Sequence, residues 1–184
     1  MSIEDEAAVV ARAIDGDAAA LEEIVRRVQD PVYRLALRMA GRPADAEDAV
    51  QEILIRIITR LASWRGEATL TTWSYRIAVN YLLNLRRTGH EQRGISFESL
   101  GADLADGLAS TAYSGPEAEL LAEEVRLGCT QAMLQCLDRP LRVTYVLGEV
   151  FLLPSDEAAW ILDVTPATYR KRLERARRSS VAAV

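Results

Sequence analysis

The C-terminal part of the chain contains the stretch Ser155-Asp-Glu-Ala-Ala-Trp-Ile-Leu-Asp-Val-Thr-Pro-Ala-Thr-Tyr-Arg-Lys-Arg-Leu-Glu-Arg-Ala-Arg-Arg178. Its first part predicts a short helix with an apolar face, and Asp163-Val164 predicts a tight turn. Thr165 then caps a second helix that has Pro166 at its first position, where a missing N–H costs nothing. This second helix carries six basic side chains and one acid. A short helix, a turn and a basic helix are typical of the helix-turn-helix motif, whose second helix enters the major groove of DNA.

The net charge of −5 contrasts with the basic character of many DNA-binding domains, but the charges are unevenly distributed. Residues 1–52 carry a net charge of −6, residues 53–93 +5, residues 94–164 −9 and residues 165–184 +5. Two basic blocks therefore alternate with two acidic blocks. All basic residues except Lys171 are arginine, a preference that suits bidentate contacts to phosphates and guanine edges and that a GC-rich genome would equally produce.

Several classes of protein are excluded by what the sequence does not contain. No apolar run approaches the ~18 residues of a membrane span, and the acidic N-terminus differs from a signal peptide, so we expect a cytoplasmic protein. Cys129 and Cys136 lie seven positions apart on a predicted helix, ~10 Å along its axis, and are interpreted as small buried hydrophobes rather than a disulfide. His90 is the only histidine, so we expect no metal site and no cofactor. No nucleotide-binding glycine loop or catalytic set is present, so we do not expect an enzyme.

Helical periodicity dominates the chain and predicts an all-α fold of two small domains joined by a flexible linker. The first domain covers residues 1–90, the acidic linker residues 91–115 and the second domain residues 116–184. Asp17 is the expected N-cap of a long helix that Pro31 should bend or divide. Thr71 or Thr72 is the expected cap of the last helix of the first domain. The helices predicted before the helix-turn-helix cover residues 6–14, 17–40, 45–61, 72–87, 116–137 and 138–150.

Three stretches carry a resemblance to a known family. Residues 45–57, from Asp45-Ala-Glu-Asp to Ile57, and residues 64–80, from Trp64-Arg-Gly-Glu to Asn80, resemble regions 2.1–2.2 and 2.3–2.4 of the group 4, or extracytoplasmic-function, sigma factors of bacterial RNA polymerase. The helix-turn-helix from Leu153 to Arg177 is similar to region 4.2 of these members of the sigma-70 superfamily. The resemblance covers nearly the whole chain. It implies a region 2 helical bundle that binds core polymerase and the minus-ten element, and a region 4 helix-turn-helix that binds the minus-thirty-five element.

The first stretch places acidic and amide side chains on one helical face. Asp45, Asp48 and Glu52 are spaced i, i+3, i+7, with Gln51 beside them. Taken alone, this pattern indicates a solvated face with acids at a helix N-terminus, where the helix dipole favours them. The resemblance implies that the face docks on the clamp helices of the polymerase β′ subunit, a role that an acidic surface suits when its partner is basic. The resemblance also implies a contact between region 4 and the β flap.

The second stretch combines basic, aromatic and amide side chains. The resemblance implies that this segment captures the melted minus-ten strand and that an extruded base enters a pocket beside the loop before the helix. Arginine suits phosphate contacts, aromatic rings stack on bases, and Asn80 and Asn84, spaced i, i+4, can face the strand. The alternative for Trp73 and Tyr81 is a place in the core. The predicted minus-ten residues are Arg65, Thr72, Trp73, Arg76, Asn80 and Asn84.

The helix-turn-helix predicts a second DNA contact, to duplex at the minus-thirty-five element. Leu173 and Ala176 should turn into the domain. Asp163 stands where the family often has glycine and tolerates a left-handed turn, while Tyr169 replaces a frequent valine and must pack differently or sit partly exposed. The alternative is a basic helix for a protein or membrane partner. The predicted contact residues are Thr165, Ala167, Thr168, Lys171, Arg172 and Arg175.

These patterns predict a sigma factor that binds core polymerase and promoter DNA and supports promoter melting without catalytic residues of its own. The alternative is a helix-turn-helix repressor or activator that acts without polymerase. The acidic face at residues 45–52 and the basic aromatic block at residues 64–80 favour the sigma factor, because a plain repressor needs neither. The sequence leaves open whether an anti-sigma factor is a further partner.

Overall fold

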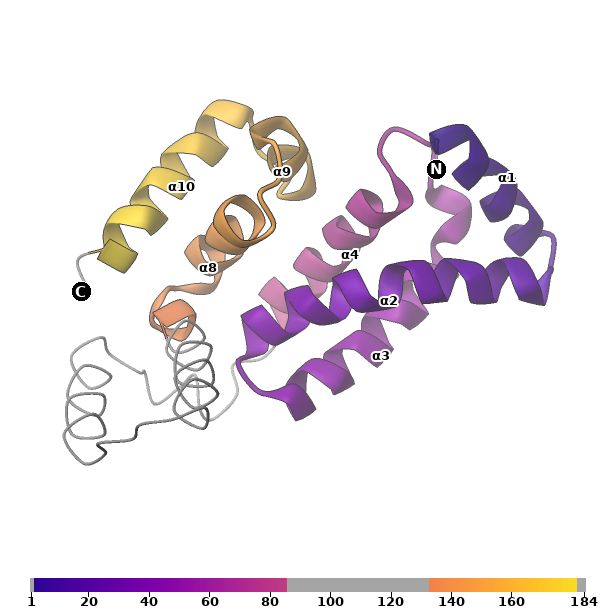
Figure 1. The fold of residues 1–184 in the computed structure, drawn as a ribbon, viewed down its shortest axis with the longest axis horizontal. Coiled ribbons are helices and arrows are strands. Elements are labelled where there is room, and N and C mark those ends of the chain that lie inside the picture. The colour runs from indigo at the N-terminus through magenta and orange to yellow at the C-terminus, as the bar shows by residue number, and fades with distance from the viewer. Residues whose placement is uncertain (1, 86–132, 182–184) are drawn as a thin grey trace, which may run out of the picture.

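The computed structural model describes residues 2–85 and 133–181, with side chains to residue 179 (Figure 1). The predicted linker and most of the helix expected from residue 116 lie outside these residues. All regular secondary structure in the described ranges is helical, which confirms the all-α prediction. The elements are α1 (Ile3–Ile14), α2 (Ala18–Ala40), α3 (Pro43–Thr59), the 3₁₀-helix η1 (Leu61–Ser63), α4 (Leu70–Asn84), α8 (Arg139–Tyr145), the π-helix η2 (Val146–Val150), α9 (Ser155–Ile161) and α10 (Pro166–Val181).

Helix α2 is the central element of the N-terminal half and contacts α1, α3 and α4. The carboxylate of Asp17 accepts hydrogen bonds from the backbone N–H groups of residues 19 and 20, at 2.9 and 3.1 Å, which confirms it as the N-cap. Gly41 ends the helix in the left-handed conformation, with φ of 80°. Of the two outcomes expected at Pro31, a bend or a division, the division is wrong, because α2 continues through it. The fully buried Val28 and Val32 flank Pro31, so the continuous helix keeps an apolar stripe that offsets one missing hydrogen bond.

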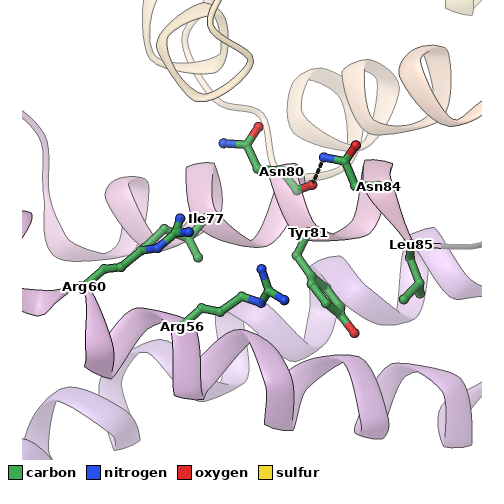
Figure 2. A pocket seen from close by; sticks show the side chains of 7 residues that line it. All are labelled: Arg56, Arg60, Ile77, Asn80, Tyr81, Asn84 and Leu85. Atoms are coloured by element: carbon green, nitrogen blue, oxygen red, sulfur yellow. Dashed lines mark hydrogen bonds between the residues drawn. The ribbon is translucent and has the colours of Figure 1, made fainter.

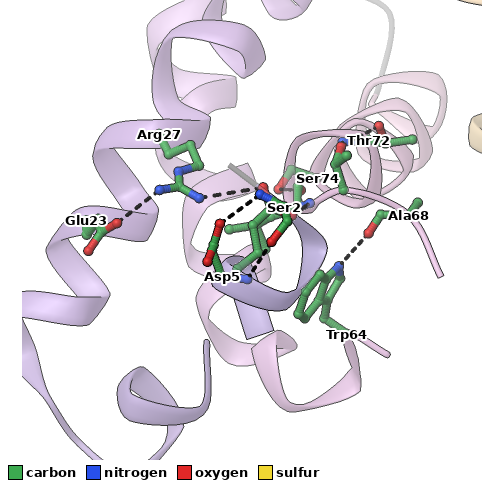
Figure 3. A network of polar contacts seen from close by, with 11 residues as sticks. Ser2, Asp5, Glu23, Arg27, Trp64, Ala68, Thr72 and Ser74 are labelled. Atoms are coloured by element: carbon green, nitrogen blue, oxygen red, sulfur yellow. Dashed lines mark hydrogen bonds and ion pairs between the residues drawn. The ribbon is translucent and has the colours of Figure 1, made fainter. Parts of the chain in front are cut away.

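Two other helices begin earlier than expected. Helix α1 starts at Ile3 because Ser2 and Asp5 form a capping box, in which each side chain accepts the other's backbone N–H, at 2.9 and 3.2 Å (Figure 3). Helix α3 starts at Pro43, two residues before Asp45, because proline is pre-organised for the first turn of a helix.

The start of α4 is held by residues far away in the sequence. Its N-cap is Thr69, not Thr71 or Thr72, and the Thr69 hydroxyl accepts the backbone N–H of Thr72 at 3.2 Å. The buried carboxylate of Glu6, on α1, accepts the backbone N–H of Leu70 at 2.8 Å. A carboxylate at this position satisfies an otherwise unpaired donor and interacts favourably with the helix dipole. Helix α1 therefore fixes where α4 begins.

The loop before α4 is ordered by a buried tryptophan. The indole N–H of Trp64 donates to the carbonyl of Ala68 at 3.1 Å (Figure 3). Arg27, on α2, lies beside this region and pairs with Glu6 at 3.5 Å. The Trp64–Ala68 hydrogen bond closes the loop at residues 64–68 on itself, next to the first turn of α4.

The C-terminal half contains the predicted helix-turn-helix. Tyr169 is fully buried rather than partly exposed, and the residue that makes room for it is Gly148 in η2. A Cβ atom at Gly148 would lie 2.5 Å from the Tyr169 hydroxyl. Burial raises the pKa of Tyr169 to about 12. Leu173 and Ala176 are buried as predicted, so the opposite side of α10 is the one that faces outward.

The two halves contact each other along α4, beside which α8 and α9 lie (Figure 1). At one end, the buried guanidinium of Arg142 donates to the carbonyl of Met39 at the end of α2, at 2.5 Å. Arg139 donates to the carbonyls of Leu82 and Leu85 at the end of α4. The C-terminal half is thus anchored on the carboxyl ends of two helices, where cationic donors are favoured.

Candidate nucleic-acid interface

The acidic face of α3 is present, and its members differ in exposure. Asp48 and Gln51 are exposed, whereas Asp45 is half-buried. Glu52 is partly exposed and pairs with Arg56 at 3.0 Å. Ile55 lies on the same face, seven positions after Asp48, and 56% of its surface is exposed. Sequence reasoning missed Ile55, although its position outside the buried stripe of α3 was a usable signal. The face therefore combines acidic and amide side chains with an apolar contact point.

The structure brings three of the predicted minus-ten residues together at a pocket of about 160 Å³ beside the loop before α4. Arg65 is exposed, whereas Trp73 and Arg76 are half-buried. The half-buried state of Trp73 fits neither a full core position nor a freely exposed ring. The pocket is lined by Ser63, Trp64, Arg65, Glu67, Ala68, Trp73, Arg76 and, from α9, Trp160.

A second pocket of about 350 Å³ lies farther along α4, against α3 (Figure 2). The exposed Asn80 and Asn84 line it, and the Asn84 amide donates to the Asn80 carbonyl at 2.7 Å. Arg56 and Arg60 reach it from α3, and the Arg56 guanidinium lies 4.8 Å from the centroid of the Tyr81 ring. Sequence reasoning did not include the two arginines in the site. Their spacing of i, i+4 within a basic block was the available signal.

Thr72 does not reach solvent in this structure, although it was predicted to contact the minus-ten strand. It is 4% exposed, and its hydroxyl donates to the carboxylate of Glu157 on α9. The reason is that Thr72 lies on the side of α4 that faces α9.

The outer side of α10 presents all six residues predicted to contact the minus-thirty-five element. Thr165, Ala167, Thr168, Lys171, Arg172 and Arg175 are exposed. The Thr165 hydroxyl accepts the backbone N–H of Thr168 at 3.2 Å, which confirms the predicted cap. Asp163 forms the turn with φ of 54°, as expected for a left-handed position.

Two other arginines of α10 are held by acids of the same half. Arg177 pairs with Glu149 at 2.6 Å, and Arg178 pairs with Glu174. The basic surface that α10 offers to a duplex is therefore centred on its first three turns.

Other classes of site find no support in the described part of the chain. No group of three or more His, Cys, Asp or Glu residues could hold a metal ion there. None of the described helices is long and apolar enough to cross a membrane. Cys136 is half-buried rather than fully buried as expected, and burial raises the pKa of its thiol, while Cys129 lies outside the described residues.

Comparison with known proteins gives a consistent result. The family Sigma-70 region 2 matches residues 24–91. The ECF RNA polymerase sigma factor SigE of Mycolicibacterium smegmatis is 35% identical over 88% of this chain, which spans 62% of the length of that protein. The ECF RNA polymerase sigma-E factor of Escherichia coli is 34% identical over 92% of this chain and 88% of its own length.

Solved structures show the same fold. CnrH, in complex with the cytosolic domain of CnrY, superposes with a TM-score of 0.67 at 20% identity, covering 95% of this chain and 94% of that one. The sigma factor RpoE of Bartonella quintana, in complex with the anti-sigma factor NepR, superposes with a TM-score of 0.59 at 18% identity, covering 88% of this chain and 94% of that one. With these folds and the sequence match to the sigma-E factor over most of both chains, this chain belongs to the extracytoplasmic-function RNA polymerase sigma factors.

Proposed function

We propose that this sigma factor binds core RNA polymerase, directs it to specific promoters in the cytoplasm and supports melting of the minus-ten element. The alternative of a repressor acting without polymerase does not account for the acidic face of α3 or for the two pockets along α4. One observation carries the proposal: α4 lines two successive pockets with arginine, aromatic and asparagine side chains. Capture of a single strand uses basic groups for its phosphates and aromatic rings for its bases, and an amide can read a base edge.

The minus-ten contact divides between the two pockets. In the first, Arg65 and Arg76 neutralise strand phosphates while Trp73 offers a ring for an extruded base. In the second, Asn80 offers a paired donor and acceptor to a base edge, and Arg56 and Arg60 add positive charge beside it. The chain contributes binding energy for the open strand and no covalent chemistry, so we infer that it is not an enzyme.

Two further surfaces complete the proposed assembly. The face of α3 with Asp45, Asp48, Gln51, Glu52 and Ile55 docks on the clamp helices of the β′ subunit, and region 4 contacts the β flap. The exposed side of α10 binds the minus-thirty-five duplex. We assign binding of core polymerase and the minus-ten element to residues 1–90, and binding of the minus-thirty-five element to residues 116–184. Residues 91–115 connect the two domains. An anti-sigma factor is a further candidate partner, since two solved relatives were determined in complex with such a factor or a cytosolic domain.

The direct test of the proposed function is transcription by purified core polymerase on a library of genomic fragments, with and without this chain. Discrete new transcripts that share an upstream sequence pattern are expected only in the presence of the chain. Identical transcripts with and without it would contradict the proposal.

Replacing Asn80 by alanine should impair promoter opening. The lost base contact corresponds to roughly 1–3 kcal/mol, or about a 5- to 150-fold drop in open complex. Permanganate reactivity of promoter thymines measures the effect. Gln29→Ala, at an exposed position of α2, is the control and should open the promoter normally. Normal reactivity with Asn80→Ala would remove Asn80 from the site.

Replacing Arg175 by alanine should weaken duplex binding by similar factors for all sequences and reduce the salt dependence by about one phosphate contact. Arg172→Ala or Lys171→Ala should instead change the sequence preference, if either side chain reaches a base. Titration of labelled minus-thirty-five duplexes at several salt concentrations measures both effects. Arg178→Ala is the matched control, because Arg178 is held by Glu174. Unchanged affinity and salt slope in both the Arg172 and Arg175 variants would show that α10 docks differently.

A further inference from the structure

The surface of α4 that is proposed to capture the minus-ten strand is in contact with α9 and the residues flanking it. Arg76 pairs with Asp163 of the turn, at 2.6 Å. The same guanidinium lies over the ring of Trp160, 4.8 Å from its centroid. Arg76 is thus engaged by two residues of the helix-turn-helix at once.

Two further contacts continue this surface. The Thr72 hydroxyl donates to Glu157, and the ring of Tyr75 stacks on Phe151 with centroids 5.5 Å apart. We call the four residues Phe151, Glu157, Trp160 and Asp163 the latch. The latch touches one side of α4 through Thr72, Tyr75 and Arg76, which lie within little more than one helical turn.

The latch presents to Arg76 the same chemistry as a nucleotide. A nucleotide offers an aromatic ring for stacking and an anionic oxygen for an ion pair, and Trp160 and Asp163 offer a ring and a carboxylate three residues apart. Trp160 also lines the pocket with Arg65 and Trp73, where the extruded base is proposed to stack. A strand and the latch therefore cannot occupy this surface together.

The ion pair between the latch and α4 is open to solvent. The carboxylate side chain of Asp163 is 79% exposed, and that of Arg76 is 32% exposed, so water and salt screen their ion pair. Glu157 and Trp160 are only half-buried. In contrast, the anchor at the other end of α4 is formed by Arg142 and Arg139, which donate to backbone carbonyls. The Arg76–Asp163 pair over the strand site is thus more exposed than the Arg142 anchor.

We propose that α9 and the following turn act as an intramolecular competitor of the minus-ten strand, so that the chain closed in this way cannot bind the strand until the latch leaves α4. The proposal rests on the assignment of α4 as the strand-binding surface. It gives Trp160 and Asp163 a second role, distinct from any part in duplex recognition. Because the Arg76–Asp163 ion pair of the latch is exposed to solvent, salt should weaken this part of the closed form.

Removing single latch groups tests the competition. We expect Asp163→Asn, which keeps a residue that tolerates the left-handed turn, to bind a fluorescein-labelled random twelve-nucleotide single strand roughly two- to fivefold more tightly than the parent chain. Asp156→Asn makes the same charge change on an exposed residue of α9 that has no described contact with α4, and should gain less. Trp160→Ala changes no charge and should also bind more tightly. Equal affinity of Asp163→Asn and Asp156→Asn, with no gain in Trp160→Ala, would overturn the proposal.

Locking the latch tests it in the opposite direction. In a chain with Cys129→Ser and Cys136→Ser, we add Thr72→Cys with Glu157→Cys, because these two side chains are in direct contact. A short bis-methanethiosulfonate cross-linker, which spans the gap left by the shorter cysteine side chains, should join the pair through two mixed disulfides, and the locked chain should lose binding to the labelled single strand. Dithiothreitol should restore the binding of the same sample. The control pair, Thr72→Cys with Asp156→Cys, should cross-link much more slowly.

Two results would overturn the proposal. A pair that does not cross-link faster than the control would show that the latch contact does not form in solution. A locked chain that binds the strand as well as its reduced form would show that the latch does not compete. The role of α4 as the strand-binding surface is tested separately, by the effect of Asn80→Ala on promoter opening in a chain with no added cysteine. If that variant fails to open promoters while the locked chain binds strand normally, the strand site stands and the competition falls.

Discussion

Reversing two charges on α3, with Asp48→Arg and Glu52→Arg together, should abolish binding to core RNA polymerase while leaving the fold intact. Both residues lie on the face that also exposes Ile55, so the change places two cations where a basic partner surface is expected. Like charges across an interface cost several kcal/mol, which corresponds to roughly a 100-fold or greater loss of affinity. Co-purification with core polymerase and fluorescence titration measure this loss.

The fold should tolerate this double change. Glu52 gives up one exposed pair with Arg56, on the same helix, and pairs of this kind contribute little to stability. The matched control is Glu22→Arg with Glu47→Arg, which changes the net charge equally at exposed positions outside this face. If the double variant at Asp48 and Glu52 still co-purified with polymerase as the parent does, α3 would not be the docking surface. A lower helix content would instead point to misfolding, and circular dichroism separates the two results.

Replacing Arg142 by methionine should lower the free energy of unfolding by about 3 kcal/mol or more. Arg142 is 3% exposed, and its guanidinium donates to the carbonyls of Leu134, Gln135 and Leu137, at 2.8–3.1 Å, as well as to Met39. Methionine fills a similar volume but leaves these acceptors without their donor. An unpaired buried polar group costs more than the hydrogen bond itself contributes.

Urea unfolding followed by circular dichroism measures this loss. Arg26→Met is the control, because Arg26 is exposed and forms one i, i+4 pair with Glu22, so its loss should stay within about 0.5 kcal/mol. Arg142→Lys should fall between the two, since an ammonium retains a positive donor but cannot reach all four carbonyls. A loss below about 1 kcal/mol in Arg142→Met would mean that water replaces the guanidinium at these carbonyls.

The sequence alone was sufficient to predict those features of the structure that depend on neighbours within about one helical turn. The Asp17 and Thr165 caps depend on hydrogen bonds that reach two or three residues, and the predicted end of the helix at residue 40 depends on a backbone angle that the next residue, Gly41, adopts freely. The outward and inward sides of α10 follow from helical periodicity, so Leu173 and Ala176 were predictable as core. The same reasoning predicted the exposure of Asp48 and Gln51 on α3, but not the half-buried state of Asp45.

Tertiary structure alone decided the features that depend on residues far apart in the chain. Thr69, Thr71 and Thr72 were all candidates for the cap of α4, and Thr69 is the cap in the structure. The carboxylate of Glu6, 64 positions before Leu70, accepts the Leu70 N–H in the same first turn. The burial of Tyr169 requires the space left by Gly148 on another helix.

The strand-binding surface also depends on residues far apart in the chain, so the sequence alone did not predict all of it. Arg56 and Arg60 join Asn80 only because α3 and α4 pack side by side, and Thr72 is covered only because α9 docks on α4. Periodicity specifies which side of a helix is buried, but the docking of helices specifies what lies against that side. That docking is set by the summed packing of elements distant in sequence, which no local pattern encodes.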